Sequence, residues 1–437
     1  MTGGPPHIAL VCWGFPPFRG SGVFRPLAIA NALVAAGADV SVVTASREVF
    51  VLHYGADINL EKQIDPRIKV IRTPFFPEAE WPLVNDWPTW RADASTSRVL
   101  KWDKTRQPFP EDHFGNWLPY ATTTLRVLHQ KKPISLIMAT GTPYVSLEAA
   151  SHFGLAYDVP VVLDDRDCSI LNVYHGTTSS AMIKREAYLQ EWLMNCAEMW
   201  FVNPPIADFV ARRFPDFEDK IRVVENGWDP GVVLPGDIRA QPTGAVRAAY
   251  IGLIGHEFPL EQILEAWKQV SLADQELSQL SMIGALGFQV DSAQKETQQK
   301  QLDEATNVRW IDHVSQPLLH TEYANLDVLL FIKSGGAMVT GGKPYEYAAT
   351  GLPIAALVDK ESDTMRVLSN YPRTHQADPT NVEAIVRAIQ SAVSDSRTDN
   401  GDRFKAAQDF GARLTRERQL ADAIERVLEL AKLRSDP

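Results

Sequence analysis

The sequence predicts an α/β protein with two Rossmann-like domains, each built on a parallel sheet, that face one another across a cleft. Two observations favour this class. Residues 7–44 read as strand, glycine loop, helix and strand, and a second alternation of strands and helices begins near residue 247. Two strands joined through a helix lie parallel. The 437 residues, 45% of them hydrophobic, supply apolar side chains for a core in each domain.

The first domain is expected over residues 1–229. It opens with an apolar run, a turn at Gly20-Ser21-Gly22 and an amphipathic helix. Its remaining elements are strands and helices in alternation, with strands at 7–13, 38–44, 134–139, 159–163, 198–202 and 221–225, and helices at 24–36, at 117–130, ending near 153 and ending near 212.

Residues 74–120 depart from this alternation. They combine several tryptophans with prolines and charged residues and show no periodicity. Long irregular segments in compact proteins are usually functional or disordered, and this one is too aromatic to be disordered. We therefore expect a lid or wall of an acceptor site, with a domain-packing insert as the alternative.

The second half of the chain begins after a turn signal at Asn226-Gly227 and Asp229. A loss of periodicity and a gain of Pro and Gly place a linker at 230–245. The second domain is expected over 246–403, followed by a C-terminal helix over 404–437 that packs back toward the first domain. The expected elements of this half are strands at 247–252, 280–283, 308–310, 326–332 and from 353, and helices at 259–272, from 343, at 382–393 and at 404–432.

Composition excludes several classes of partner. A formal net charge of -11 disfavours nucleic acid and anionic membranes, which need a concentrated basic face. The chain has no long apolar run and no signal-peptide pattern at its start, so we expect a cytoplasmic protein without stable membrane insertion. Three cysteines without C-x-x-C spacing argue against a disulfide framework and a zinc site. Small-molecule substrates are the expected partners, and the oligomeric state stays open.

A second glycine-rich stretch leads into a helix with charges in its first turn. Lys343 and Glu346 stand three residues apart after Gly341-Gly342, and Gly351 is the expected helix stop. The unpaired N–H groups and the positive dipole end of a helix N-terminus favour an anion. The sequence therefore predicts an anion site here, while the alternative makes both charges solvated residues that stabilise the helix.

A polar turn follows the strand at 159–163. Its residues Asp165, Arg166 and Asp167 stand where open α/β sheets place ligands, at the carboxyl end of a parallel strand. The two aspartates have three possible roles. They contact a substrate, they bind a metal as a pair, or they belong to a polar turn in which they pair with Arg166 or cap the next helix. No third metal ligand is evident nearby, so we predict acceptor contacts and no metal.

Three motifs, Trp-Leu-Pro near residue 117, a Gly-x-Pro turn at 141–143 and an Asp-Arg-Asp turn at 165–167, are most similar to a bacterial subset of the retaining family 4 glycosyltransferases of the GT-B fold. Four segments resemble the family as a whole. They are the Phe-Pro-Pro and Gly-x-Gly opening that ends at Arg25, the stretch Val-Val-Glu-Asn226-Gly-Trp-Asp229, Tyr-Ile-Gly252, and Lys343-Pro-Tyr-Glu346-Tyr-Ala-Ala-Thr-Gly-Leu-Pro. The resemblance implies a nucleoside diphosphate sugar, GDP- or UDP-linked, held mainly by the second domain. It also implies an acceptor held mainly by the first domain, no metal and no other cofactor.

The resemblance assigns roles to single residues. Glu346 falls on the second glutamate of the family's E-x7-E motif, which accepts hydrogen bonds from the donor's ribose, whereas Met338 stands where the first glutamate would be. The diphosphate-binding arginine expected after Gly252 is missing, so Lys343 becomes the main candidate for stabilising the leaving diphosphate. Lys343 and Glu346 are thus the predicted catalytic residues. The further donor-binding candidates are Gly20, Ser21, Gly22, Arg25, Gly252, His256, Ser334, Gly335, Gly336, Ala337 and Gly342, and the acceptor-binding candidates are Tyr144, Asp165, Arg166 and Asp167.

The predicted function is metal-independent, retaining transfer of a sugar from a nucleoside diphosphate sugar to a small-molecule or glycan acceptor. Negative charge that builds on the leaving phosphate can be stabilised by preorganised donors, without a protein nucleophile. Two alternatives stay open: a nucleotide-sugar epimerase on the same fold, and a nucleotide-sugar binding protein without catalysis.

Overall fold

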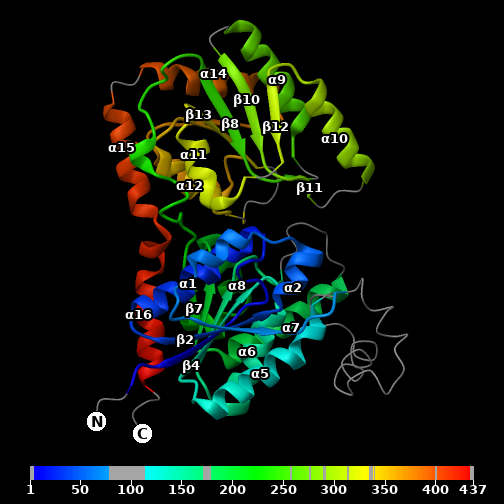
Figure 1. The fold of residues 1–437 in the computed structure, drawn as a ribbon, viewed down its shortest axis with the longest axis vertical. Coiled ribbons are helices and arrows are strands. Elements are labelled where there is room, and N and C mark those ends of the chain that lie inside the picture. The colour runs from blue at the N-terminus through cyan, green and yellow to red at the C-terminus, as the bar shows by residue number, and fades with distance from the viewer. Residues whose placement is uncertain are drawn as a thin grey trace. The chain divides into compact units, whose positions relative to one another are not determined.

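The computed structural model describes residues 4–77, 114–170, 179–255, 258–274, 277–288, 292–312, 314–333, 338, 340–398 and 401–433. The chain divides into two compact units, one formed by Met1–Glu225 with Gln419–Pro437 and the other by Asn226–Arg418. The predicted linker at 230–245 lies within the second unit. Each unit is built on a parallel sheet, as the α/β prediction requires (Figure 1).

The sheet of the first unit has seven strands in the order β3-β2-β1-β4-β5-β6-β7. The strands are β1 (His7–Val11), β2 (Asp39–Ala45), β3 (Lys69–Thr73), β4 (Leu136–Gly141), β5 (Val161–Asp165), β6 (Glu198–Phe201) and β7 (Ile221–Val223). All adjacent strands pair in parallel. The strand order reverses between β1 and β4, which makes this pair the switch point of the sheet.

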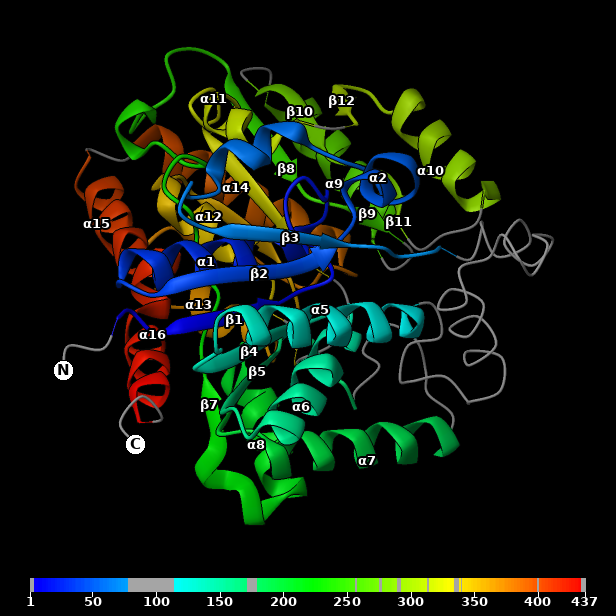
Figure 2. The same cartoon turned by 60° about the horizontal axis from the view of Figure 1, so that its bottom comes forward.

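The helices of the first unit alternate with the strands, and connections between parallel strands are right-handed as a rule. They are α1 (Phe24–Ala35), α2 (Arg47–Val49), α5 (Leu118–Lys131), α6 (Val145–Tyr157), α7 (Ser179–Asn195) and α8 (Pro204–Arg213). Figure 2 shows α5 and α6 along one side of the sheet. Side chains of β1 and β4 pack on the other side with α1, where Ile8, Leu10 and Leu33 belong to one buried cluster.

The second unit contains a six-stranded sheet in the order β12-β10-β8-β13-β14-β15 and a separate parallel pair, β9 and β11. The strands are β8 (Val246–Ile251), β9 (Ile254–Gly255), β10 (Leu277–Ile283), β11 (Leu286–Phe288), β12 (Val308–Ile311), β13 (Val328–Ile332), β14 (Ile354–Leu357) and β15 (Thr374–Ala377). The order reverses between β8 and β13.

Helices lie on both faces of this sheet. They are α9 (Leu260–Ala273), α10 (Ser292–Glu304), α11 (Leu319–Tyr323), α12 (Lys343–Thr350), α13 (Asp363–Leu368), α14 (Val382–Thr398) and α15 (Asp402–Gly411). Alternate residues of β13 belong to different cores: Leu330 packs with α9 and α14, and Leu329 packs with α12. A strand whose neighbours on both faces are helices is apolar throughout, which explains its run of five buried residues.

The C-terminal segment forms two helices where the sequence predicts one over 404–432. After α15, residues 412–415 break the helix, and α16 (Arg416–Lys432) follows. The division between the units falls within α16, after Arg418. Residues of α16 at helical spacing, including Leu420, Ile424 and Val427, join the buried cluster of β1 in the first unit. No helix in the described ranges is both long and apolar enough to cross a membrane.

Gly411 allows α15 to cross α12 closely. A Cβ atom at this position would lie 2.3 Å from the carbonyl oxygen of Ala348 and 2.6 Å from the Cα of Ala349. Both neighbours are backbone atoms, so the helices would have to move apart. We expect Gly411→Ala to lower the unfolding free energy by about 1–3 kcal/mol, as overpacking does.

Denaturant unfolding checks this expectation, with Gly244→Ala as the control. A Cβ at Gly244 meets no atom within 4 Å, so that variant should unfold like the wild type. Equal unfolding of both variants would show that the α12–α15 crossing tolerates a methyl group.

Candidate functional site

The switch point of the second unit places two loops at one edge of its sheet. The chain leaves β8 through α9 toward β10 on one side, and it leaves β13 through α12 toward β14 on the other (Figure 1). Open α/β sheets bind ligands in the crevice that such diverging connections create. Gly252 follows β8 directly and Lys333 follows β13 directly, so both lie at this edge.

Helix α12 is fixed to the end of β8. The backbone N–H of Ile251 donates to the Tyr347 hydroxyl at 2.8 Å, and that hydroxyl lies 3.3 Å from the Ile251 carbonyl oxygen. Gly351 ends the helix with a φ of 80°, in the left-handed region that favours glycine. The predicted helix start at Lys343 and stop at Gly351 are confirmed. Gly342, one of the predicted donor-binding residues, is the N-cap residue of this helix.

Three side chains meet in the first turn of α12, and we call them the Lys343 cluster: Lys343, Glu346 and Tyr323. The Lys343 Nζ lies 2.5 Å from Glu346 Oε2, and the Tyr323 hydroxyl donates to the same oxygen at 3.1 Å. The Lys343 ammonium also lies 6.0 Å from the centre of the Tyr323 ring. Burial raises the pKa of Tyr323 well above its usual value, so its hydroxyl stays protonated and acts as a donor.

The Lys343 cluster combines two chemical capabilities. The carboxylate of Glu346 can accept hydrogen bonds from sugar hydroxyls, and two neighbours hold it in place. The Lys343 ammonium, with a side chain 31% exposed, stands beside the N–H groups at the start of α12 and can meet an anion. An anion linked to a hydroxyl-bearing ring matches this pair.

The segment that enters α12 is tied down on two sides. The Thr340 hydroxyl is hydrogen-bonded to the Asp363 carboxylate, which also pairs with Arg366 at 2.8 Å. The Asn226 side-chain amide donates to the Thr340 carbonyl oxygen at 3.3 Å. These contacts explain how the loop before α12 is positioned, and they connect it to α13.

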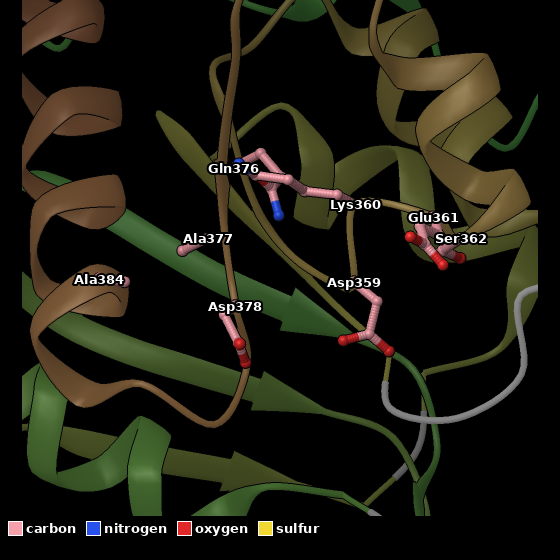
Figure 3. Close-up of a pocket in the computed structure, with 8 residues that line it drawn as sticks. All are labelled: Asp359, Lys360, Glu361, Ser362, Gln376, Ala377, Asp378 and Ala384. Atoms are coloured by element: carbon pink, nitrogen blue, oxygen red, sulfur yellow. The ribbon is translucent and has the colours of Figure 1, made fainter.

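A polar pocket of about 670 Å³ lies at the carboxyl ends of β14 and β15 (Figure 3). Its lining consists of Asp359, Lys360, Glu361, Ser362, Gln376, Ala377, Asp378 and Ala384. Carboxylates on the loop after β14 and on the loop after β15 face the same hollow. This lining is suited to hydroxyl groups or amines rather than to an apolar ligand.

In the first unit, the predicted residues of two loops meet at the β1–β4 switch point. Arg166, after β5, donates to the carbonyl oxygen of Gly22 at 2.7 Å and to that of Gly141 at 2.6 Å. Gly20 packs against the Phe18 ring, and Ser21 opens a short helical turn. The turn at Gly20–Gly22 is therefore held against Arg166 at the carboxyl edge of this sheet.

The Arg25 side chain makes buried contacts within the first unit. Its side chain is 2% exposed and its Nη2 lies 2.8 Å from Asp164 Oδ1, with Asp164 fully buried. The same guanidinium donates to the carbonyl oxygens of Val224 at 2.8 Å and Glu225 at 3.0 Å. Arg25, a predicted donor-binding residue, is therefore buried and joined to the protein's own acceptors in this structure.

The remaining acceptor candidates differ in exposure. Tyr144 is buried at the start of α6, and Asp165 is fully buried, with its Oδ2 accepting from the Ser169 N–H at 2.8 Å. Asp167 accepts from the Thr142 hydroxyl at 2.8 Å in an exposed contact. Among the described residues no set of three or more His, Cys, Asp or Glu side chains is arranged to hold a metal ion. Arg166 and Asp167 are thus the candidates nearest to solvent.

Burial raises the pKa of Asp165 to about 6, because the anion is desolvated. A carboxyl whose pKa is higher in the folded than in the unfolded chain destabilises the fold as pH rises through that window. We expect Asp165→Asn to gain stability relative to the wild type between about pH 4 and about pH 7, since the amide has no proton to lose.

Urea unfolding of both proteins across this range measures the difference. A stability difference that does not change with pH would show that Asp165 titrates normally. Asp167→Asn removes a half-buried carboxylate from the same turn and is the comparison variant.

Several predicted residues lie outside the described residues. They are His256, Ser334, Gly335, Gly336 and Ala337, together with residues 78–113 of the aromatic segment. Met338, which stands in place of the first glutamate, is half-buried in a turn before α12.

Sequence reasoning missed three residues of the site: Tyr323, Lys333 and Asp363. Tyr323 lies at the end of α11, far from Glu346 in sequence, and no local pattern joins the two. Lys333 offered a weaker signal, because it stands directly after a buried strand, where open sheets place ligands, whereas Asp363 is the first residue of α13.

No family model matches the sequence, and no curated protein sequence matches it. Solved structures match it along nearly its whole length. Sucrose-phosphate synthase from Thermosynechococcus elongatus matches with a TM-score of 0.62 at 17% identity, over 98% of this chain and 98% of that one. HepE from Anabaena in complex with UDP has a TM-score of 0.64 at 12% identity, over 96% and 100%. A putative UDP-N-acetylglucosamine 2-epimerase from Listeria monocytogenes has a TM-score of 0.56 at 13% identity, over 99% and 97%.

At these identities the likeness establishes the fold. The chain has the GT-B fold, in which two Rossmann-like units follow one another, and the predicted fold class is confirmed.

Proposed function

We propose that the protein is a retaining glycosyltransferase that moves a sugar from a nucleoside diphosphate sugar to a small-molecule or glycan acceptor. The observation that carries the proposal is the Lys343 cluster. It sets a carboxylate, an ammonium and a helix N-terminus side by side at the switch-point edge of the second unit. A nucleoside diphosphate carries ribose hydroxyls and an anionic diphosphate, the two kinds of group that a carboxylate and an ammonium at a helix N-terminus can bind.

Glu346 is assigned to the ribose. Its carboxylate is 11% exposed, and the Lys343 ammonium and the Tyr323 hydroxyl hold one of its oxygens. A carboxylate fixed in this way accepts hydrogen bonds from a hydroxyl pair without first losing side-chain entropy. The assignment agrees with the place of Glu346 in the motif that the sequence resembles.

Lys343 is assigned to the leaving diphosphate. As the bond between the sugar's anomeric carbon and the phosphate oxygen breaks, that oxygen gains negative charge. The ammonium and the N–H groups at the start of α12 are already in place to stabilise it. The acceptor then attacks from the face that the diphosphate leaves, and the phosphate takes its proton, so the anomeric configuration is retained. The proposal needs no metal.

The acceptor is assigned to the first unit. Arg166 and Asp167 lie at the edge of its sheet, beside the turn at Gly20–Gly22 and close to solvent.

Two solved structures of similar fold support a nucleotide-sugar as the donor. HepE was determined with UDP, and a trehalose-phosphate enzyme from E. coli was determined with UDP-2-fluoro glucose.

Product analysis tests the proposal. The protein is incubated with UDP- and GDP-linked sugars and a panel of hydroxyl, amine and thiol acceptors, with and without a chelator. We expect one donor to release its nucleoside diphosphate and form an α- or β-glycoside of unchanged anomeric configuration, equally well with chelator. Inversion of the anomeric configuration would contradict a retaining mechanism. Loss of activity with the chelator would contradict metal-independent transfer.

An epimerase is the second candidate, because a putative UDP-N-acetylglucosamine 2-epimerase is among the structures of the same fold. Incubation with each donor alone discriminates between the two. A rearranged nucleotide-sugar without any acceptor would favour the epimerase. Binding of a donor without turnover of any kind would favour a non-catalytic protein.

A further inference from the structure

We propose that Asn226 is a positioning residue for donor binding, which holds the backbone N–H groups before α12 in the direction that meets the diphosphate. The inference rests on the proposed function, because it concerns the same ligand. The backbone in question is the Thr340 loop, which consists of Thr340, Gly341 and Gly342 and leads directly into α12.

The two glycines of the Thr340 loop are approachable but are not held by packing. A Cβ atom at Gly341 or Gly342 would meet no atom of the described chain within 4 Å, and Gly341 is exposed. Glycine loses more conformational freedom on ordering than any other residue. The arrangement of this backbone is therefore set by its flanks, which are Thr340 on one side and α12 on the other.

Thr340 is anchored through both its side chain and its backbone. The residue is buried, its hydroxyl is hydrogen-bonded to the Asp363 carboxylate, and its carbonyl oxygen accepts from the Asn226 amide at 3.3 Å. That carbonyl belongs to the same planar peptide unit as the Gly341 N–H. In a trans peptide the two groups point in opposite directions. Because Asn226 fixes the carbonyl, it also fixes the Gly341 N–H, which points away from Asn226.

The Asn226 amide is itself held in one orientation. Its carbonyl oxygen accepts from Arg416 Nη1 at 3.5 Å, while its nitrogen donates to Thr340. A guanidinium only donates and a backbone carbonyl only accepts, so these two neighbours determine which way the amide points. The Arg416 side chain is 6% exposed and its Nε lies 2.9 Å from Asp229 Oδ1, which fixes the guanidinium in turn.

The backbone around Asn226 is fixed against the segment that carries Arg416. The Trp228 N–H donates to the Leu414 carbonyl oxygen at 3.1 Å, and the Arg416 N–H donates to the Trp228 carbonyl oxygen at 2.8 Å. A Cβ atom at Gly227 would lie 2.6 Å from the Arg416 Cα, so the two segments approach as closely as a glycine permits. Asn226 thus projects from a well-supported backbone and can hold the Thr340 loop in place.

Isothermal titration of the full-length protein with UDP and GDP tests the inference. For the nucleotide that binds, Asn226→Ala is expected to weaken the affinity about 3- to 10-fold, the usual effect of losing one hydrogen bond. The affinity for the corresponding nucleoside, measured by competition, should change less than about twofold, because Glu346 keeps Lys343 and Tyr323 as partners. A general loosening of the unit would weaken the binding of both ligands alike.

Asn370→Ala is the control. It removes an exposed asparagine between α13 and β15 and should bind both ligands like the wild type. Equal losses of diphosphate and nucleoside affinity in Asn226→Ala, or no loss of either, would overturn the positioning role and leave the proposed function standing. Failure of the wild type to bind either nucleotide would overturn both.

A second variant decides the question if Asn226→Ala does not fold. Asn226→Asp keeps an acceptor for Arg416 and lacks the N–H group that Thr340 needs. The same two affinities are measured in about 0.5 M salt, where the added negative charge is screened. A selective loss of diphosphate affinity is again the expected result, and unchanged affinities would overturn the role of Asn226.

Discussion

Lys343→Ala is expected to lower kcat for sugar transfer by about 100-fold or more, because it removes a preorganised donor to the charge on the leaving diphosphate. The side chain is partly exposed in the first turn of α12, and its ammonium lies 2.5 Å from Glu346. Its removal leaves the buried faces of the helix untouched, so the midpoint of thermal unfolding should stay close to that of the wild type. Steady-state release of nucleoside diphosphate measures the effect.

Two variants accompany this measurement. Lys268→Ala removes an exposed lysine of α9 in the same unit and should keep full activity. Glu346→Ala removes both the partner of Lys343 and the proposed ribose acceptor, so it should mainly raise the KM for the donor. Full activity in Lys343→Ala would contradict the catalytic role proposed for Lys343.

Arg25→Ala is expected to lower the unfolding free energy of the first unit by about 3–5 kcal/mol, because it leaves a buried carboxylate without its cation. Asp164 is fully buried and, among the described residues, would keep the hydrogen bond from the Thr140 hydroxyl at 2.7 Å. The carbonyl oxygens of Val224 and Glu225 would also lose the hydrogen bonds that Arg25 donates. Hydrogen exchange of peptides from β1 and β5 in increasing urea measures the stability of this unit.

An exposed ion pair of the same unit is the control. Arg47 pairs with Glu61 at 3.0 Å, with side chains 45% and 29% exposed, and Arg47→Ala should leave the urea midpoint nearly unchanged. If Arg25→Ala instead had the same urea midpoint as the wild type and lost affinity for the donor, the sequence-based assignment of Arg25 to the donor would be right.

Much of the fold could be predicted because each buried strand of a parallel sheet is a continuous apolar run. The run Val328–Ile332 and the helix stop at Gly351 are local signals, and each was placed correctly. β15 was not predicted. Its residues, Thr374–Ala377, carry three polar side chains, and it forms a strand at the edge of the sheet through pairing with β14.

The site was predictable only in part, since local patterns do not show which distant residues meet. Lys343 and Glu346 share one turn of a helix, so their spacing alone predicted their contact. Arg25 looked like a phosphate ligand because its partner Asp164 stands far along the chain. The same holds for Tyr323, whose hydroxyl reaches Glu346 only after α11 and α12 pack together.

Hydrogen exchange of the wild-type protein with and without saturating UDP or GDP tests the central claim most directly. A ligand that binds the folded state slows local opening where it makes contact. We predict slower exchange with one of the two nucleotides in peptides covering α12 and the end of β8, and a smaller change in Glu346→Ala. Protection confined to the first unit, or no protection with either nucleotide, would contradict the assignment of the donor to the Lys343 cluster.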